Sequence, residues 1–137
     1  KEMLYACVNF NQNINNWNVS SVTDMSGMFV ACRRFNQPLN NWNVSQVTDM
    51  NLMFFRTNDF NQNLSNWEVG NVTNMRRMFH ESAISYPMNN WDVSKVSDMA
   101  SMFFNTALSN ENYDKTLIGW SNQTSLQISV VFNGGNS

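Results

Sequence analysis

Amide, hydroxyl and carboxylate side chains recur at fixed places along the chain, and together they could hydrogen-bond to a partner. The strongest candidates alternate with large apolar residues, and we call this set the polar strip. Its candidate ligand-binding residues are Asn16, Asn18, Asn41, Asn43, Asn66, Glu68, Asn90 and Asp92. Amides donate and accept hydrogen bonds, and ionised carboxylates only accept them. Because these groups repeat in columns and do not cluster as acids and bases in one coil, the pattern argues against catalysis.

Two interpretations of the polar strip stay open. The strip could be a binding face, because repeat proteins commonly use an extended surface for their partners. Alternatively, its amides and hydroxyls could only solubilise the surface and hydrogen-bond along their own ladder. The strip is neutral in its first half and carries Glu68 and Asp92 in its second half. This asymmetry favours a polar or cationic partner.

The polar strip is part of a repeat that organises nearly the whole chain. Trp17, Trp42, Trp67 and Trp91 mark its period, with spacings of 25, 25 and 24 residues. A fixed period in this range is the signature of a stacked repeat architecture. Each unit carries eight large apolar positions, which one unit alone could not bury but stacked neighbours could.

The spacing within one unit predicts its local structure. Trp17, Asn18 and Val19 alternate between apolar and polar, as in a short strand. Val22, Met25 and the apolar residues that follow lie at helical spacing, as in a short helix or 3₁₀ turn. We therefore expect an α/β repeat solenoid, a leucine-rich-repeat-like right-handed coil. It would have a short parallel β-sheet, short helical turns on the other side, and a helix–strand C-terminal cap.

The chain divides into a repeat array and a capping segment. We expect the array over residues 1–107, with a partial coil at 1–9 and coils beginning near 10, 35, 60 and 84. Residues 108–137 break the period and form the cap of the same domain. The cap should contain a helix with Ser109 as N-cap and with Tyr113, Leu117 and Trp120 on one face. A strand should follow at 126–130.

Composition excludes several classes of function. Only 13% of the residues are charged, the net charge is −2, and no basic cluster exceeds two residues. Nucleic-acid binding needs a basic stripe, so no nucleic-acid partner is expected. No apolar run approaches the ~20 residues of a membrane span, so this segment should not insert into a membrane. Residues 1–10 match the middle of a repeat, and we expect the chain to be part of a longer one.

For the aspartate, methionine and histidine positions, a structural role is favoured over catalysis or metal binding. Asp24, Asp49, Asn74 and Asp98 form a column that could hold Ca²⁺, but they stand where turn caps belong. The methionine columns have the spacing of core residues. His80 is the only histidine, so no catalytic constellation can be assembled, and it should lie on the surface. We expect no enzyme activity, no metal and no cofactor.

Cys7 and Cys32 occupy the same column of adjacent coils, at about the distance that a disulfide spans. The same column also holds Thr57 and Thr106, so a small buried residue suffices there. A disulfide and two small core thiols are both compatible with the pattern.

The repeated motif carries a family resemblance. Read across the four copies, F-N-Q-x-[LI]-x-x-W-[NED]-V-S-x-V-T-[DN]-M-x-x-M-F resembles the BspA-like, leucine-rich-repeat-related family of mycoplasma and other bacterial surface proteins. The resemblance implies a secreted or surface-anchored protein, and some family members are adhesins. From the resemblance together with the polar strip, we therefore predict a non-catalytic extracellular binding or adhesion module for a protein or glycan on a host or neighbouring cell. The alternative is a structural spacer or stalk with no ligand.

Overall fold

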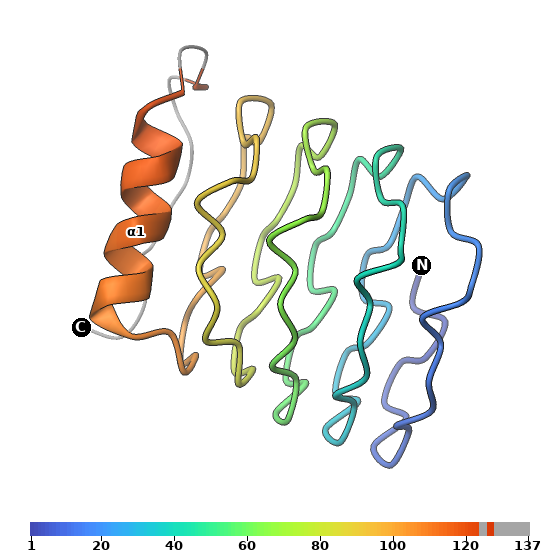
Figure 1. Ribbon diagram of the computed structural model, residues 1–137. Coiled ribbons are helices and arrows are strands. Elements are labelled where there is room, and N and C mark those ends of the chain that lie inside the picture. Colours follow the sequence, from blue (N-terminus) through green and yellow to red (C-terminus); the bar gives the residue numbers. More distant parts are fainter. Residues whose placement is uncertain (124–125, 128–137) are drawn as a thin grey trace.

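The computed structural model describes residues 1–123 and 126–127 (Figure 1). One helix is present among them, α1 (Asn110–Ser121). The rest of the described chain winds into a row of similar coils, which ends against α1 (Figure 1). Each coil consists of turns and extended links, and successive repeats lie side by side. The stacking expected from the 25-residue period is therefore present.

The expected α/β class is nevertheless wrong, because the described residues contain no β-sheet and no helical turn within the repeats. The β-structure between successive described coils is limited to isolated parallel bridges, one in each interface between full repeats. These bridges are Asp24–Asp49, Asp49–Asn74 and Asn74–Asp98. The coils are thus not those of a leucine-rich-repeat-like solenoid with a parallel sheet.

The segment that was expected to be a strand is too short to pair. Its alternation is correct, since Trp42 and Val44 are buried while Asn43 is exposed. However, turns bound it on both sides: the N–H of Trp42 donates to the carbonyl of Leu39 at 3.1 Å, and that of Val47 to Val44 at 2.9 Å. Among the described residues, no backbone hydrogen bond joins residues 42–44 to a neighbouring coil, so no ladder forms there.

The segment that was expected to be helical makes the main contact between coils instead. The N–H groups of Gly27 and Phe29 donate to carbonyls of the next coil, at Asn51 (2.8 Å) and Met53 (2.9 Å). The N–H of Met28, between them, donates to Met25 at 3.2 Å. An α-helix would use all these N–H groups within the segment. Here every second one binds a neighbouring coil, so no helix forms.

This alternation requires left-handed backbone at two positions in each coil. Residues with positive φ fall into two columns spaced by the repeat: Glu2, Gly27, Leu52, Arg77 and Ser101, with φ from 51° to 63°, and Ala6, Ala31, Arg56, Glu81 and Asn105, with φ from 54° to 57°. Nine of the ten are not glycine, so each carries a steric cost of about 1–2 kcal/mol. The bonds between coils must outweigh that cost.

The core consists of apolar columns that run from coil to coil. Phe29, Phe54 and Phe79 stack at 5.3 and 5.6 Å between ring centroids, and Phe103 continues the column at 6.1 Å. The methionine columns are buried, which confirms that they are core. Dispersion between such close-packed groups is weak for each pair and large in total.

Each buried tryptophan also binds the backbone of the coil before it. The indole Nε1–H groups of Trp42, Trp67 and Trp91 donate to the carbonyls of Ile14, Leu39 and Leu64 at 3.0, 3.1 and 2.9 Å. These carbonyls lie inside the core, where an unpaired polar group would be costly. The tryptophan column therefore both fills and satisfies the interior.

The helix α1 closes the last coil by imitating a further repeat. Ser109 caps it as expected, accepting a hydrogen bond from the N–H of Asn112 at 3.2 Å. Trp120 is buried, stacks on Phe103 at 6.1 Å and donates from Nε1 to the carbonyl of Met88 at 2.8 Å. The N–H of Met88 donates to Thr116 Oγ1 at 3.0 Å. The strand expected at 126–130 lies largely outside the described residues, and the division at residue 107 stays a prediction.

Backbone strain predicts opposite effects of glycine at two equivalent positions. Gly27→Ala should lower the free energy of unfolding by about 1 kcal/mol, because Gly27 has φ +63° and its Cβ would lie 2.8 Å from Glu2 Cγ. Ser101→Gly, in the same column, should be neutral or stabilising by a few tenths of a kcal/mol, since relieved strain exceeds the added entropy of the unfolded chain. Urea unfolding followed by tryptophan fluorescence measures both, and equal losses would contradict the left-handed assignment.

The contact between α1 and the last coil predicts that Gly119→Ala is destabilising. Helix propensity alone would favour alanine by about 1 kcal/mol. However, a Cβ at Gly119 would lie 2.4 Å from the carbonyl oxygen of Asn89, so we expect a net loss of about 1–3 kcal/mol. The exposed Asp114→Ala on the same helix is the control. A higher melting temperature for Gly119→Ala would show that α1 does not approach the coil so closely.

Candidate functional site

All eight residues predicted for the polar strip are exposed. The structure fixes several of their side chains by local hydrogen bonds. Asn43 Oδ1 accepts from both the N–H and the hydroxyl of Ser45, at 3.0 and 2.7 Å. Asn18 does the same with Ser20, at 3.2 and 2.7 Å. These turns fix the direction of the side chain in the first two full coils.

Asp92 forms the corresponding turn in the last full coil. Its Oδ1 accepts from the N–H of Ser94 at 3.0 Å. Hydrogen bonds from Ser94 hold the pKa of Asp92 below its usual value, and nearby Lys95 contributes. The Nζ of Lys95 in turn donates to Asn71 Oδ1 at 2.7 Å. The carboxylate of Asp92 is therefore partly compensated within the protein.

The third full coil departs from this pattern. Glu68 replaces the turn-forming residue, and Gly70 replaces the serine that would bind it. Among the described residues, Glu68 makes no hydrogen bond and no ion pair. In the part of the chain that the structure describes, it is the one side chain of its column that accepts no hydrogen bond.

A shallow polar hollow of about 240 Å³ lies beside Glu68. Its lining comes from two neighbouring coils: Asn41, Trp42, Asn43, Val44, Asn66 and Glu68. The structure thus brings four of the eight predicted residues together in one depression. It does not include Asn16, Asn18, Asn90 or Asp92 in that depression. The hollow is the candidate binding site.

Other asparagines form ladders between coils, as the non-binding interpretation proposed. Asn11 Oδ1 accepts from the N–H of Asn36, and Asn36 Oδ1 accepts from the N–H of Asn61, both at 3.0 Å. Asn66 Nδ2, within the strip itself, donates to the carbonyl of Asn40 at 3.1 Å. Many of the asparagines therefore have a structural role. On this surface, some amide atoms hold the coils together, as the non-binding interpretation expects, while others remain available to a partner, as the binding interpretation expects.

An apolar hollow of about 390 Å³ lies at the first coil. Trp17 is 41% exposed there, whereas Trp42, its equivalent in the next coil, is 3% exposed. The sequence placed Trp17 in the same class as the buried tryptophans. Trp17 borders this hollow together with Lys1 and Met3, which precede the first full coil.

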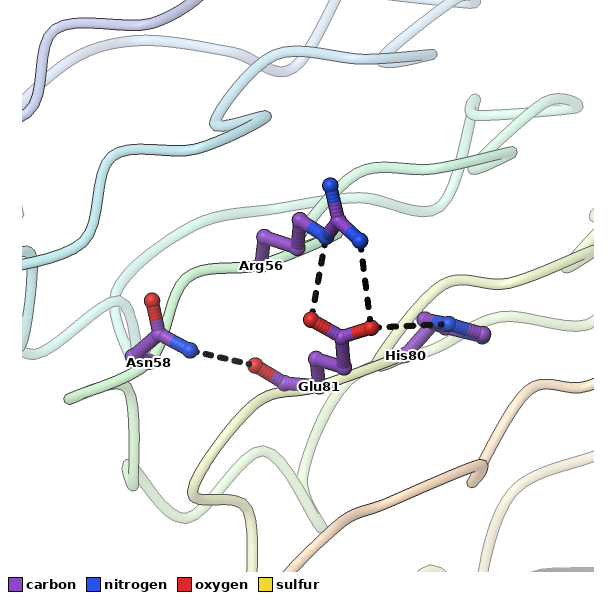
Figure 2. Close-up of polar contacts among 4 residues, drawn as sticks. All are labelled: Arg56, Asn58, His80 and Glu81. Carbon is purple, nitrogen blue, oxygen red and sulfur yellow. Dashed lines mark hydrogen bonds and ion pairs between the residues drawn. The ribbon is translucent and has the colours of Figure 1, made fainter.

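A second polar cluster joins two coils and was not anticipated from the sequence (Figure 2). Arg56 donates to Glu81 through Nε at 2.9 Å and through a terminal nitrogen at 3.4 Å. Asn58 Nδ2 donates to the carbonyl of Glu81 at 3.2 Å. Arg56 and Glu81 lie 25 residues apart, in one column, and that spacing was the available signal. The pair lowers the pKa of Glu81.

His80 lies beside this cluster and is more enclosed than the sequence suggested. Its ring is stacked between Phe55 and Phe104, with centroid distances of 5.0 and 4.7 Å. Its Nε2 is 3.4 Å from Glu81, and its Nδ1 is buried without a hydrogen-bond partner among the described residues. Burial lowers the pKa of His80, and the positive charge of Arg77 adds to this, although Glu81 opposes it.

The aspartate column caps backbone turns, as its position indicated. Asp24 accepts from the N–H of Ser26 at 2.8 Å, and Asp49 from the N–H of Asn51 at 2.7 Å. The hydrogen bonds from Ser26 lower the pKa of Asp24. Within the described part of the chain, no three metal-ligating residues are grouped so that they could hold an ion.

Cys7 and Cys32 are both free thiols in the structure, one exposed and one buried. The thiol of Cys32 donates to the carbonyl of Leu4 at 2.8 Å. Burial raises the pKa of Cys32 to about 11. Cys32 is thus a small core residue, whereas Cys7 is exposed, and the disulfide between them stays a prediction.

These observations define a class: a repeat protein of stacked, turn-built coils, closed by a helix and carrying a polar face. The chain belongs to the family described as "Mycoplasma protein of unknown function, DUF285", which matches residues 1–120. The match covers the four full repeats and extends to Trp120 in α1. No curated protein and no solved structure matches the chain. Among the described residues, no helix is long and apolar enough to cross a membrane.

The enclosed His80 predicts a specific pH dependence of stability. Its folded-state pKa is lowered, so the unfolded chain binds the proton more readily. Its contribution should be complete above the usual histidine pKa of about 6.5 and should be lost as the pH falls below it. His80→Phe should remove this dependence between pH 5 and 7. It should also raise the free energy of unfolding by about 1 kcal/mol, because it eliminates a buried unpaired nitrogen.

Urea unfolding at a series of pH values measures this effect. Glu81→Gln, which keeps the histidine, is the control and should retain a slope in that range. The stability contributed by carboxylates such as Glu81, whose pKa is lowered, is complete at neutral pH and is lost only as the pH falls below the usual range of a glutamate. These carboxylates therefore add no slope between pH 5 and 7. An unchanged slope in His80→Phe would contradict the assignment.

Proposed function

We propose that this chain is a non-catalytic binding module of a bacterial surface protein, and that the polar strip is its binding face. The observation that carries the proposal is the hollow beside Glu68. Four residues of the polar strip, from two adjacent coils, line this one hollow. A strip that only solubilised the surface would not need such a depression.

The chemistry of the hollow suits reversible binding. Amide groups can donate and accept hydrogen bonds, while a carboxylate accepts them. A shallow polar surface of this kind gains affinity from several modest contacts. The partner would be a protein or a glycan on a host or neighbouring cell.

The extracellular location is part of the proposal. It is supported by the match to a family of mycoplasma proteins and by the motif's resemblance to BspA-like surface repeats, some of which are adhesins. The stacked architecture is compatible with such a role, because added coils extend a face without changing its local geometry.

A structural spacer is the second candidate, and the asparagine ladders favour it. Ladders such as Asn11–Asn36–Asn61 use amides to hold coils together. A spacer would need these ladders but no hollow. It would tolerate deletion of one whole repeat, whereas a binding face built from two adjacent coils would not.

A binding screen with matched variants tests the proposal. The purified protein would be screened against extracellular-matrix proteins and a glycan panel. The face variant combines Asn41→Ala, Asn66→Ala and Glu68→Gln. The control variant combines three comparable changes in other columns: Gln37→Ala, Gln62→Ala and Glu111→Gln.

We expect the face variant to weaken a genuine interaction by about tenfold or more, since it removes two or more hydrogen bonds at about 1 kcal/mol each. The control variant should bind like the wild type. Thermal unfolding should show that both variants are folded. Binding that survives in the face variant, or the absence of any partner, would favour the spacer.

A further inference from the structure

The environment of Glu68 indicates the chemistry of the group that occupies the hollow. Elsewhere, the protein itself shows how a glutamate is compensated between coils. Arg56 lies one repeat before Glu81 and donates to both of its carboxylate oxygens (Figure 2). A guanidinium is planar and matches the two oxygens of a carboxylate.

Glu68 has no such neighbour. The equivalent positions in the preceding and following coils are Asn43 and Asp92, and neither is cationic. Lys95, which lies beyond Asp92, donates to Asn71. No described residue donates to the carboxylate of Glu68, and the side chain is exposed beside a hollow of about 240 Å³.

The other polar atoms of the hollow complete the pattern. Asn66 uses Nδ2 to bind the carbonyl of Asn40, which leaves its Oδ1 as an acceptor. Asn43 uses Oδ1 to accept from Ser45, which leaves its Nδ2 as a donor. The hollow thus offers two kinds of acceptor, one of them charged, next to an amide donor.

We propose that this hollow binds an arginine side chain of an extended peptide segment in a protein partner. The guanidinium would donate to Glu68 and to Asn66 Oδ1, as Arg56 does to Glu81. Asn43 Nδ2 would donate to a main-chain carbonyl of the same segment. This inference rests on the proposed binding function and narrows it to one class of partner.

The departure from the repeat supports the same conclusion. In the other full coils, the residue equivalent to Glu68 closes a turn with a serine. The Glu68–Gly70 combination gives up that turn. Gly70 also leaves room for the neighbouring Asp92, because a Cβ at Gly70 would lie 3.0 Å from Asp92 Oδ2. The exposed, unpaired carboxylate of Glu68 favours a cation over a neutral ligand in the hollow.

Titration of the whole chain with short capped peptides tests the inference. Four probes are compared by amide chemical-shift changes: a Gly-Arg-Gly peptide, its lysine and citrulline counterparts, and a glucosamine oligomer. Citrulline keeps the shape of arginine without its charge. Glu68→Gln is the test variant, and Glu111→Gln, an exposed glutamate on α1, is the control for net charge.

We expect the arginine peptide to shift the signals of Asn43, Asn66 and Glu68. Citrulline or Glu68→Gln should weaken this binding by about tenfold, and Glu111→Gln should change it by less than about twofold. The inference is overturned if Glu68→Gln binds as tightly as the wild type. It is also overturned if the lysine peptide or the glucosamine oligomer binds more tightly, or if no probe binds at millimolar concentration.

The two proposals fail in distinguishable ways. One outcome of the binding screen is a partner whose affinity depends on Asn41 and Asn66 but not on Glu68. This result would support the binding module and contradict the arginine site. If the arginine peptide binds at Glu68 but the screen finds no macromolecular partner, the arginine site is supported and the proposed binding function is contradicted.

Discussion

The structure depends on hydrogen bonds that one coil alone is unable to make. Within each repeat, every second N–H of the segment that begins at Met25, Met50 or Met75 donates to the next coil. In the opposite direction, each buried tryptophan indole donates to a carbonyl of the coil before it. These bonds lie around an apolar interior, where unpaired polar groups are costly. A coil is therefore stable only between two neighbours, and α1 supplies the last neighbour through Trp120 and Thr116.

The same dependence explains why the backbone accepts unusual geometry. Nine non-glycine residues with positive φ would be unfavourable in an isolated peptide. They persist because two left-handed positions per coil belong to a segment whose N–H groups alternate between the next coil and the local turn. The strain recurs at the same two columns in each repeat. It is thus a property of the architecture and is not in itself a sign of a functional site.

The proposed binding site lies where the repeat is interrupted on an otherwise regular surface. Asparagine serves as an internal connector in several columns, so its abundance alone does not identify a binding face. At Glu68 the local turn with a serine is missing, and the carboxylate lies beside a hollow without a hydrogen-bond partner among the described residues. At Glu81 a comparable carboxylate is neutralised by Arg56. The two glutamates show how the same scaffold can use one charge for cohesion and leave another available to a partner.

The sequence alone determined the period, the identity of the core columns, the outward direction of the polar strip and the capping helix at Ser109. These features follow from side-chain polarity and spacing, which a repeat displays several times over. Only the tertiary structure decided the backbone. Apolar spacing at Val22, Met25, Met28 and Phe29 is compatible with a helix, but also with turns that give alternate N–H groups to a neighbouring coil. Which of these forms depends on partners 25 residues away. The hollow at Glu68 and the enclosure of His80 also depend on the tertiary structure, because each is formed by side chains from adjacent coils.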